Sequence, residues 1–342
     1  MLFPITENIA RTGRHTSFYL ACGAADAPLI IFAHGWPELS VSWRHQLPAF
    51  AALGFRAIAP DMRGYGRSSV YPKSEDYALE HTVADMIELI DHLGAEKAVW
   101  VGHDWGSPVI WSVASHHPER VRAVANLCVP YVPDGFAVDN LVKLVDRSVY
   151  PEDQFPAGQW DYMRFYEESL ATATAQFEAN IPALVKLLFR AGAPGGEASP
   201  AGTAQVRKTG GWFGDGAAPD VPIDASVLTE EDFHKYSEAL QRNGFFGPDS
   251  WYVNGPRNIE FAKKARNGGR LEMPALFLHG AYDYVCYTMA GPLPQPMRAA
   301  CANLTEVVVH SGHWMAQEMP VSVNAALAKW LAEQCPELWG RS

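Results

Sequence analysis

An aspartate that follows an apolar run is the first candidate for chemistry in this chain. Residues 98–101 are apolar, and residues 102–106 read Gly-His-Asp-Trp-Gly, with the aspartate at position 104. A glycine on each side of Asp104 allows a tight turn between a buried strand and a helix, which is typical of a nucleophile elbow. Pro108 lies where the first helical turn tolerates proline. The alternative interpretation is an ordinary strand-to-helix turn with a capping aspartate.

Two later residues complete a set with Asp104. Asp283 follows the apolar run 275–278, and His313 follows the apolar run 306–309. The carboxyl ends of parallel strands lie at one edge of a sheet, so these side chains are expected to meet there. The pattern predicts a carboxylate nucleophile, an orienting acid and a histidine base. Taken singly, Asp283 is also compatible with a turn residue and His313 with a surface-loop histidine.

A further turn follows the first apolar run. Residues 34–37 read His-Gly-Trp-Pro directly after the run 29–33. The backbone N–H groups of Trp36 and Trp105 are predicted to form an oxyanion hole beside the elbow. A simple turn is the alternative, because glycine and proline both favour turns.

Alternating short apolar runs and helical patterns predict an α/β fold with a mostly parallel sheet flanked by helices. The runs cover residues 29–33, 55–59, 98–101, 121–127, 275–278 and 306–309. Apolar residues recur at helical spacing from Val83 to Leu93, with Thr82 and Asp85 as a predicted capping box and Gly94 as the helix stop. A final amphipathic helix is predicted around residues 323–331.

The middle of the chain has a different pattern. Residues 131–266 have sequence patterns typical of helices and loops, and no buried strand is obvious among them. They are predicted to form a mainly helical lid inserted into an α/β core made of residues 1–130 and 267–342. The stretch from residue 191 to about residue 222 is long for a loop without regular structure, so a functional or mobile role is expected.

Composition excludes several classes of function. The formal net charge is −11, which argues against nucleic acid as a partner because phosphate binding needs a basic face. The five cysteines are scattered and odd in number, so neither a disulfide framework nor a cysteine metal site is expected. No signal peptide or membrane-spanning run is evident, and a cytoplasmic location is the expectation.

The chain resembles the soluble epoxide hydrolases of the α/β-hydrolase superfamily, in which the order nucleophile, acid, histidine recurs. The resemblance extends over nearly the whole chain, and its motifs lie at residues 34–38, 60–68, 102–106 and 312–314. The first three motifs also occur in haloalkane dehalogenases. The resemblance implies that no metal or organic cofactor is needed. Dimers are common in this fold family, so a homodimer is a candidate assembly.

Two tyrosines of the lid carry the finer distinction. Tyr162 lies in an aromatic-Asp-Tyr context and Tyr252 in a Trp-Tyr-x-Asn context, both similar to epoxide hydrolases, with Tyr166 as the alternative for the first. Dehalogenases often have asparagine at the position of Trp36, and it is missing here. Ser107 departs from the epoxide hydrolase pattern and keeps the dehalogenase interpretation open.

The residue types also restrict the reaction. An aspartate is ionised at neutral pH and needs no base, and its attack on an sp3 carbon gives a stable alkyl ester. An opening epoxide needs a proton donor such as tyrosine, whereas a halide does not. The sequence therefore predicts hydrolysis of a small lipophilic epoxide by water to a vicinal diol. A haloalkane dehalogenase and a catalytically silent binding protein remain the alternatives.

Overall fold

The computed structural model describes residues 3–214 and 216–339 and contains an eight-stranded, mostly parallel sheet. The strands are β1 (Thr6–Arg11), β2 (Thr16–Cys22), β3 (Leu29–Ala33), β4 (Arg56–Pro60), β5 (Ala98–His103), β6 (Val121–Leu127), β7 (Leu271–Gly280) and β8 (Cys301–Val309). Their order across the sheet is β1-β2-β4-β3-β5-β6-β7-β8. The pairs β1–β2 and β2–β4 are antiparallel, and the remaining neighbours are parallel.

Each of the six apolar runs coincides with a strand, as its composition predicted, although Phe55 lies just before β4. Strands β3, β5 and β6 are almost completely buried because helices cover both faces of the sheet. Strands β1 and β2 were not predicted. Most side chains of β1 are exposed, so its sequence lacks the apolar run on which the prediction depended.

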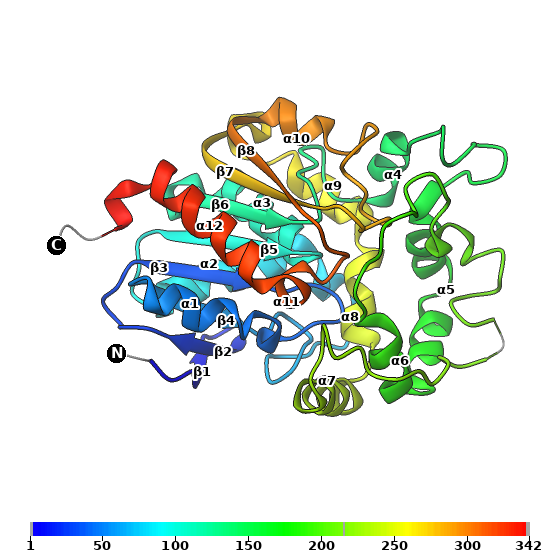
Figure 1. Cartoon of the computed structure of the whole chain (residues 1–342), viewed down its shortest axis with the longest axis horizontal. Coiled ribbons are helices and arrows are strands. Elements are labelled where there is room, and N and C mark those ends of the chain that lie inside the picture. Colours follow the sequence, from blue (N-terminus) through cyan, green and yellow to red (C-terminus); the bar gives the residue numbers. More distant parts are fainter. Residues whose placement is uncertain (1–2, 215, 340–342) are drawn as a thin grey trace.

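Helices lie on both sides of the sheet (Figure 1). The helices are α1 (Gln46–Ala52), α2 (Leu79–His92), α3 (Gly106–His116), α4 (Val138–Leu141), α5 (Asp161–Glu178), α6 (Ile181–Leu188), α7 (Glu230–Asn243), α8 (Phe246–Ser250), α9 (Gly255–Ala262), α10 (Gln295–Ala300), α11 (Met315–Glu318) and α12 (Pro320–Gln334). Helix α1 contacts α12, and α2 contacts α3.

The predicted capping box of α2 is wrong. The helix begins at Leu79, whose backbone N–H donates to Asn258 Oδ1 at 3.0 Å. Thr82 lies inside the helix, and its hydroxyl donates to the Leu79 carbonyl. A side chain from a distant part of the chain therefore takes the capping role. The predicted stop is correct, because Gly94 follows the helix with a φ of 71°.

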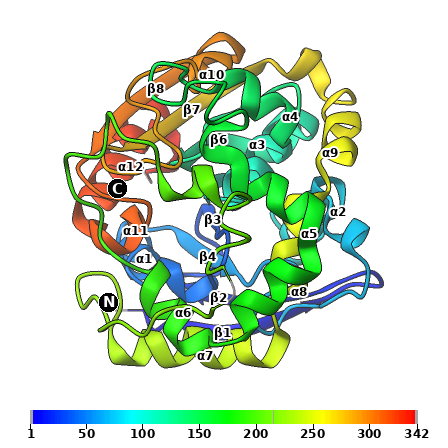
Figure 2. The ribbon, with the colours of Figure 1, turned by 90° about the vertical axis from the view of Figure 1, so that its right-hand side faces the viewer.

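Helices α4 to α9 lie between β6 and β7, in the segment predicted as a lid. The described residues of the range 131–266 contain no strand. Figures 1 and 2 show α5, α6 and α7 gathered at one end of the sheet, opposite the two chain termini. Among its described residues, the loop between α6 and α7 contains one short 3-10 helix, Gly202–Gln205, and no other regular element.

Within the described part of the chain, no helix has the length and apolar character needed to cross a membrane.

Candidate active site

Asp104 sits in a sharp turn between β5 and α3. Its φ is 48°, a backbone value that residues other than glycine rarely adopt. The turn fits only because its glycines lack a Cβ: at Gly102 a Cβ would lie 2.8 Å from the Ser107 Cα, and at Gly106 it would lie 2.2 Å from the Ala33 carbonyl oxygen. The strand and helix can therefore pack closely while the carboxylate of Asp104 points out of the turn.

The other two predicted residues meet Asp104. His313 lies after β8, with Nε2 3.6 Å from Asp104 Oδ2. Its Nδ1 lies 2.7 Å from Asp283 Oδ2. The second oxygen of Asp283 accepts the backbone N–H of Cys286 at 3.1 Å, which fixes the carboxylate. The structure thus brings Asp104, His313 and Asp283 into one chain of contacts, with His313 between the two carboxylates.

Burial and charge act in opposite directions on this histidine. Burial alone would lower the pKa of His313, but the carboxylates of Asp283 and Asp104 outweigh it and raise that pKa well above the ordinary value. Burial also opposes the charge of Asp283, yet the nearby histidine holds the pKa of Asp283 below its usual range. The site therefore favours an ionised Asp283 and a protonated His313 while Asp104 carries its charge.

The predicted oxyanion hole faces the nucleophile. The backbone N–H of Trp36 donates to Asp104 Oδ1 at 2.6 Å. A Cβ at Gly35 would lie 2.3 Å from the same oxygen and 2.5 Å from the backbone nitrogen of Trp105. The Trp36 and Trp105 nitrogens and the Asp104 carboxylate thus converge on one small space, which Gly35 leaves open.

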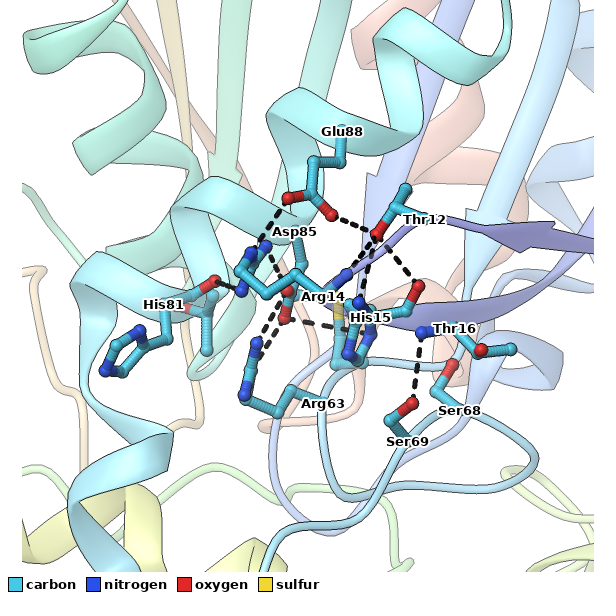
Figure 3. A network of polar contacts seen from close by, with 12 residues as sticks. Thr12, Arg14, His15, Thr16, Arg63, Ser68, Ser69, His81, Asp85 and Glu88 are labelled. Carbon is cyan, nitrogen blue, oxygen red and sulfur yellow. Dashed lines mark hydrogen bonds and ion pairs between the residues drawn. The ribbon is translucent and has the colours of Figure 1, made fainter.

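A network of charges holds the turn that carries Trp36. His34 Nε2 accepts the backbone N–H of Met62 at 2.9 Å, which links the turn to the loop after β4. The next residue, Arg63, binds both carboxylate oxygens of the buried Asp85 at 2.7 Å. Figure 3 shows Arg14 meeting the same carboxylate, at 2.6 Å. The β1–β2 turn and α2 are therefore connected, through the loop after β4, to the turn of residues 34–37 (the oxyanion turn).

A buried ion pair connects the two loops of the site. His103 Nδ1 contacts Glu38 Oε2 at 2.7 Å, and His103 Nε2 lies 2.7 Å from the His313 carbonyl oxygen. Glu38 Oε2 also accepts the backbone N–H of Gly35 at 3.0 Å. Despite burial, the partners lower the pKa of Glu38 to about 2 and raise that of His103 to about 10. The imidazolium donates from both nitrogens and joins the oxyanion turn to the loop of His313.

A cavity of about 330 Å³ opens above Asp104. Tyr162 on α5 and Tyr252 after α8 both line it, together with His313. The centroids of the two phenol rings are 5.7 Å apart. Burial, and then the nearby negative charge, raises the pKa of each tyrosine well above its ordinary value, so both remain proton donors at neutral pH.

Tyr166 is placed differently from Tyr162, although both are on α5. Its ring stacks on that of Tyr252 at 4.4 Å and is fully buried. Its hydroxyl has no hydrogen-bond partner among the described residues, and Tyr166 does not line the cavity of Asp104. Tyr166 therefore supports Tyr252 from behind, and Tyr162 is the tyrosine of α5 that reaches the cavity.

One cluster of metal-ligating atoms occurs among the described residues. Single ligand atoms of His103, Cys128 and His313 lie within 4.8 Å of one another. Both ring nitrogens of His103 already contact Glu38 and the His313 carbonyl, so a metal ion there would have to break the buried ion pair. The donor set fits the hydrogen-bond network better than it fits a metal centre.

Comparison with known proteins identifies the family. The model of the alpha/beta hydrolase fold family matches residues 28–318. The chain belongs to this family. The fold class predicted from the strand and helix pattern is thereby confirmed.

The relatives agree with the resemblance drawn from the motifs. Epoxide hydrolase A of Mycobacterium tuberculosis (strain ATCC 25618 / H37Rv) is 34% identical over 333 residues, which are 95% of this chain and 97% of that protein. Bifunctional epoxide hydrolase 2 of Sus scrofa is 34% identical over 309 residues, and the chain spans about half (51%) of its length. The crystal structure of epoxide hydrolase A from Mycobacterium thermoresistibile has a TM-score of 0.79 and 33% identity, covering 96% of this chain and 98% of that one.

Sequence reasoning missed two participants. Gly35 and Glu38 lie in the motif at residues 34–38, but no role was predicted for either residue. Glycine between a histidine and a tryptophan after a buried strand is a signal that could have found Gly35. The contact of Glu38 with His103 joins residues 65 positions apart, and no local pattern indicates it.

Proposed function

We propose that this protein is an epoxide hydrolase that adds water to a lipophilic epoxide through a covalent ester on Asp104. The observation that carries the proposal is the pair Tyr162 and Tyr252, which lines the same cavity as Asp104 and His313. A carboxylate faces two protonated phenols across this space, as opening of a strained ether requires. The names of the relatives support the same activity.

The first half of the reaction forms the ester. A carboxylate oxygen of Asp104 attacks a ring carbon, and the carbon–oxygen bond of the epoxide breaks. Tyr162 and Tyr252 donate hydrogen bonds to the departing oxygen, and one of them gives it a proton. A haloalkane would need only N–H donors for its halide, so two phenols that line the cavity favour the epoxide.

The second half of the reaction hydrolyses the ester. His313, oriented by Asp283, removes a proton from water, and the resulting hydroxide attacks the carbonyl carbon of Asp104. The backbone N–H groups of Trp36 and Trp105 stabilise the oxyanion that forms there. Collapse of this intermediate releases the diol and restores the carboxylate. Before ester hydrolysis begins, the protonated His313 of the resting enzyme gives its proton through water to the phenolate that ring opening leaves. His313 is protonated again at the end of the cycle, so the net reaction consumes one epoxide and one water.

The proposal also includes the division of labour along the chain. Residues 1–130 and 267–342 form the hydrolase core, and residues 131–266 form the lid that supplies the two tyrosines. Helices α5 and α8 carry or immediately precede these tyrosines, which supports this division. A homodimer and a cytoplasmic location complete the proposal, to be tested by size-exclusion chromatography and cell fractionation.

The test is intact mass spectrometry of His313→Ala mixed with a panel of epoxides and chloroalkanes. Without its base, the enzyme should accumulate the ester on Asp104. A mass gain equal to the whole epoxide is the expected result, and peptide mapping should place it on Asp104. His310→Ala is the matched control, because His310 is an exposed histidine of the same loop. It should turn over epoxide without a trapped adduct.

Other outcomes would reject the proposal. A mass gain equal to an alkyl group without its halogen would identify a dehalogenase. No adduct with either set, together with no turnover by the wild type, would favour a binding protein built on the hydrolase fold.

A further inference from the structure

A carboxyl group in the lid reaches the oxyanion turn of the core. Asp249 on α8 is completely buried. Its Oδ1 accepts the indole N–H of Trp36 at 3.0 Å, and its Oδ2 lies 3.0 Å from the hydroxyl of Thr174 on α5. Within residues 3–214 and 216–339, no cationic side chain pairs with it. Three segments far apart in the chain therefore meet on one carboxyl group.

The environment of this carboxyl group determines its protonation state. Burying a carboxylate without a counterion is costly, so such a group takes up a proton instead. Burial raises the pKa of Asp249 well above its usual range, and the hydrogen bonds from Trp36 and Thr174 only partly oppose this. In the neutral form, one oxygen accepts from the indole of Trp36, and the protonated oxygen donates to the hydroxyl of Thr174.

The partner of Asp249 is the residue whose main chain faces the nucleophile. The Trp36 backbone N–H lies 2.6 Å from Asp104 Oδ1, and its ring packs against that of Tyr252 with a centroid distance of 6.1 Å. Tyr252 follows Asp249 by three residues. The Asp249 side chain thus fixes Trp36, whose backbone N–H is the proposed donor to the oxyanion. The Trp36 ring in turn packs against Tyr252, the proposed donor to the epoxide oxygen.

We propose that Asp249 is a positioning residue that locks the Trp36 indole to the lid and thereby holds the Trp36 backbone N–H in line with Asp104. The inference rests on the proposed function. The oxyanion that this N–H stabilises forms during ester hydrolysis. Hydrolysis therefore depends on the hydrogen bond between Asp249 and the Trp36 indole more than ring opening does. A displacement of about 1 Å at such a donor can cost about 100-fold in rate.

The decisive variants change the acceptor and the donor of the lock separately. Asp249→Leu removes the acceptor, and Trp36→Phe removes the indole N–H while retaining an aromatic ring and the backbone N–H. Each should slow ester hydrolysis by about 10- to 100-fold and change ring opening less than about threefold. The double variant should be no slower than the slower single variant, because both changes break the same bond.

Two further variants separate positioning from general stability. Asp249→Asn retains an oxygen for the indole of Trp36 and an N–H for Thr174, so it should restore hydrolysis to within about threefold of the wild type. Ser250→Ala is the matched control, since Ser250 is the buried neighbour on α8 and its hydroxyl donates to the Phe246 carbonyl at 2.6 Å. It should leave both steps unchanged.

Rapid-quench sampling with intact mass detection measures the two rates in each variant. Three results would overturn the inference. The first is equal slowing of both steps, and the second is additive effects in the double variant. The third is a lower melting temperature with no change in the ratio of the ring-opening rate to the hydrolysis rate. If Asp249→Leu does not fold, Trp36→Phe decides alone by the same ratio. A wild-type enzyme that forms no diol would instead reject the proposed function, so the two failures are distinguishable.

Discussion

Replacing Asp283 with asparagine should separate the two halves of the reaction. The side chain is buried, and its two oxygens serve different donors: Cys286 N–H at 3.1 Å and His313 Nδ1 at 2.7 Å. An asparagine that keeps its oxygen on the Cys286 N–H turns its own N–H₂ group toward His313. The imidazole must then accept at Nδ1 and carry its proton on Nε2, the nitrogen that faces Asp104. A base in this tautomer cannot take a proton from water.

The expected magnitude follows from the loss of general base catalysis. Ester hydrolysis by Asp283→Asn should fall about 10² to 10⁴-fold, which corresponds to about 3 to 5 kcal/mol of transition-state stabilisation. Ring opening should change less than about tenfold, because attack by Asp104 uses no base. Rapid-quench experiments with intact mass detection should therefore show nearly all enzyme as the ester at steady state.

Specific results would refute this reasoning. If the variant accumulates no ester, or if both steps slow equally, Asp283 does not act through the tautomer of His313. Slowing of hydrolysis by less than about tenfold would also contradict a general base role of this size. Asp153→Asn is the control, since Asp153 is an exposed aspartate outside the cavity, and it should leave both rates unchanged.

Four further predictions concern the two tyrosines, the oxyanion turn and the buried ion pair. Replacing both Tyr162 and Tyr252 with phenylalanine should slow ring opening by about 10² to 10⁴-fold and leave hydrolysis of a preformed ester almost unchanged, as single-turnover traces can show. Gly35→Ala should abolish diol formation while the far-ultraviolet circular dichroism spectrum stays native, because its Cβ would lie 2.3 Å from the nucleophile's oxygen. Glu38→Gln should lower the free energy of unfolding by about 3 to 5 kcal/mol, since it leaves the buried His103 cation without its partner. In the wild type, the contribution of Glu38 to stability should be lost as the pH falls toward about 2 and that of His103 as it rises toward about 10, and urea titrations at several pH values test both signs.

The sequence predicted the parts of the fold that depend on burial. Parallel strands in the middle of the sheet are apolar along their length, so their apolar runs can be recognised in the amino-acid sequence. The edge strand β1 exposes most of its side chains and has no such run. The start of α2 was wrong for a different reason: its cap comes from Asn258, a residue 179 positions away. Local pattern cannot reveal a cap of this kind.

The candidate site divides in the same way. Asp104, Asp283 and His313 follow apolar runs, and strand topology alone brings their positions to one edge. Tyr162 and Tyr166 are four residues apart and share a helical face, so the sequence left the choice open. Tertiary packing separates them, because Tyr166 stacks on Tyr252 while Tyr162 lines the cavity.

The charges of the proposed site change in the order that the reaction needs. Before reaction, the carboxylates of Asp104 and Asp283 both raise the pKa of His313, which favours its protonated form. Ester formation on Asp104 removes one of these two negative charges, while burial continues to favour the neutral imidazole. The pKa of His313 therefore falls when the ester forms, and the histidine becomes a base at the step that requires one. The proton that His313 loses passes through water to the phenolate left by ring opening, so base activation follows from ring opening.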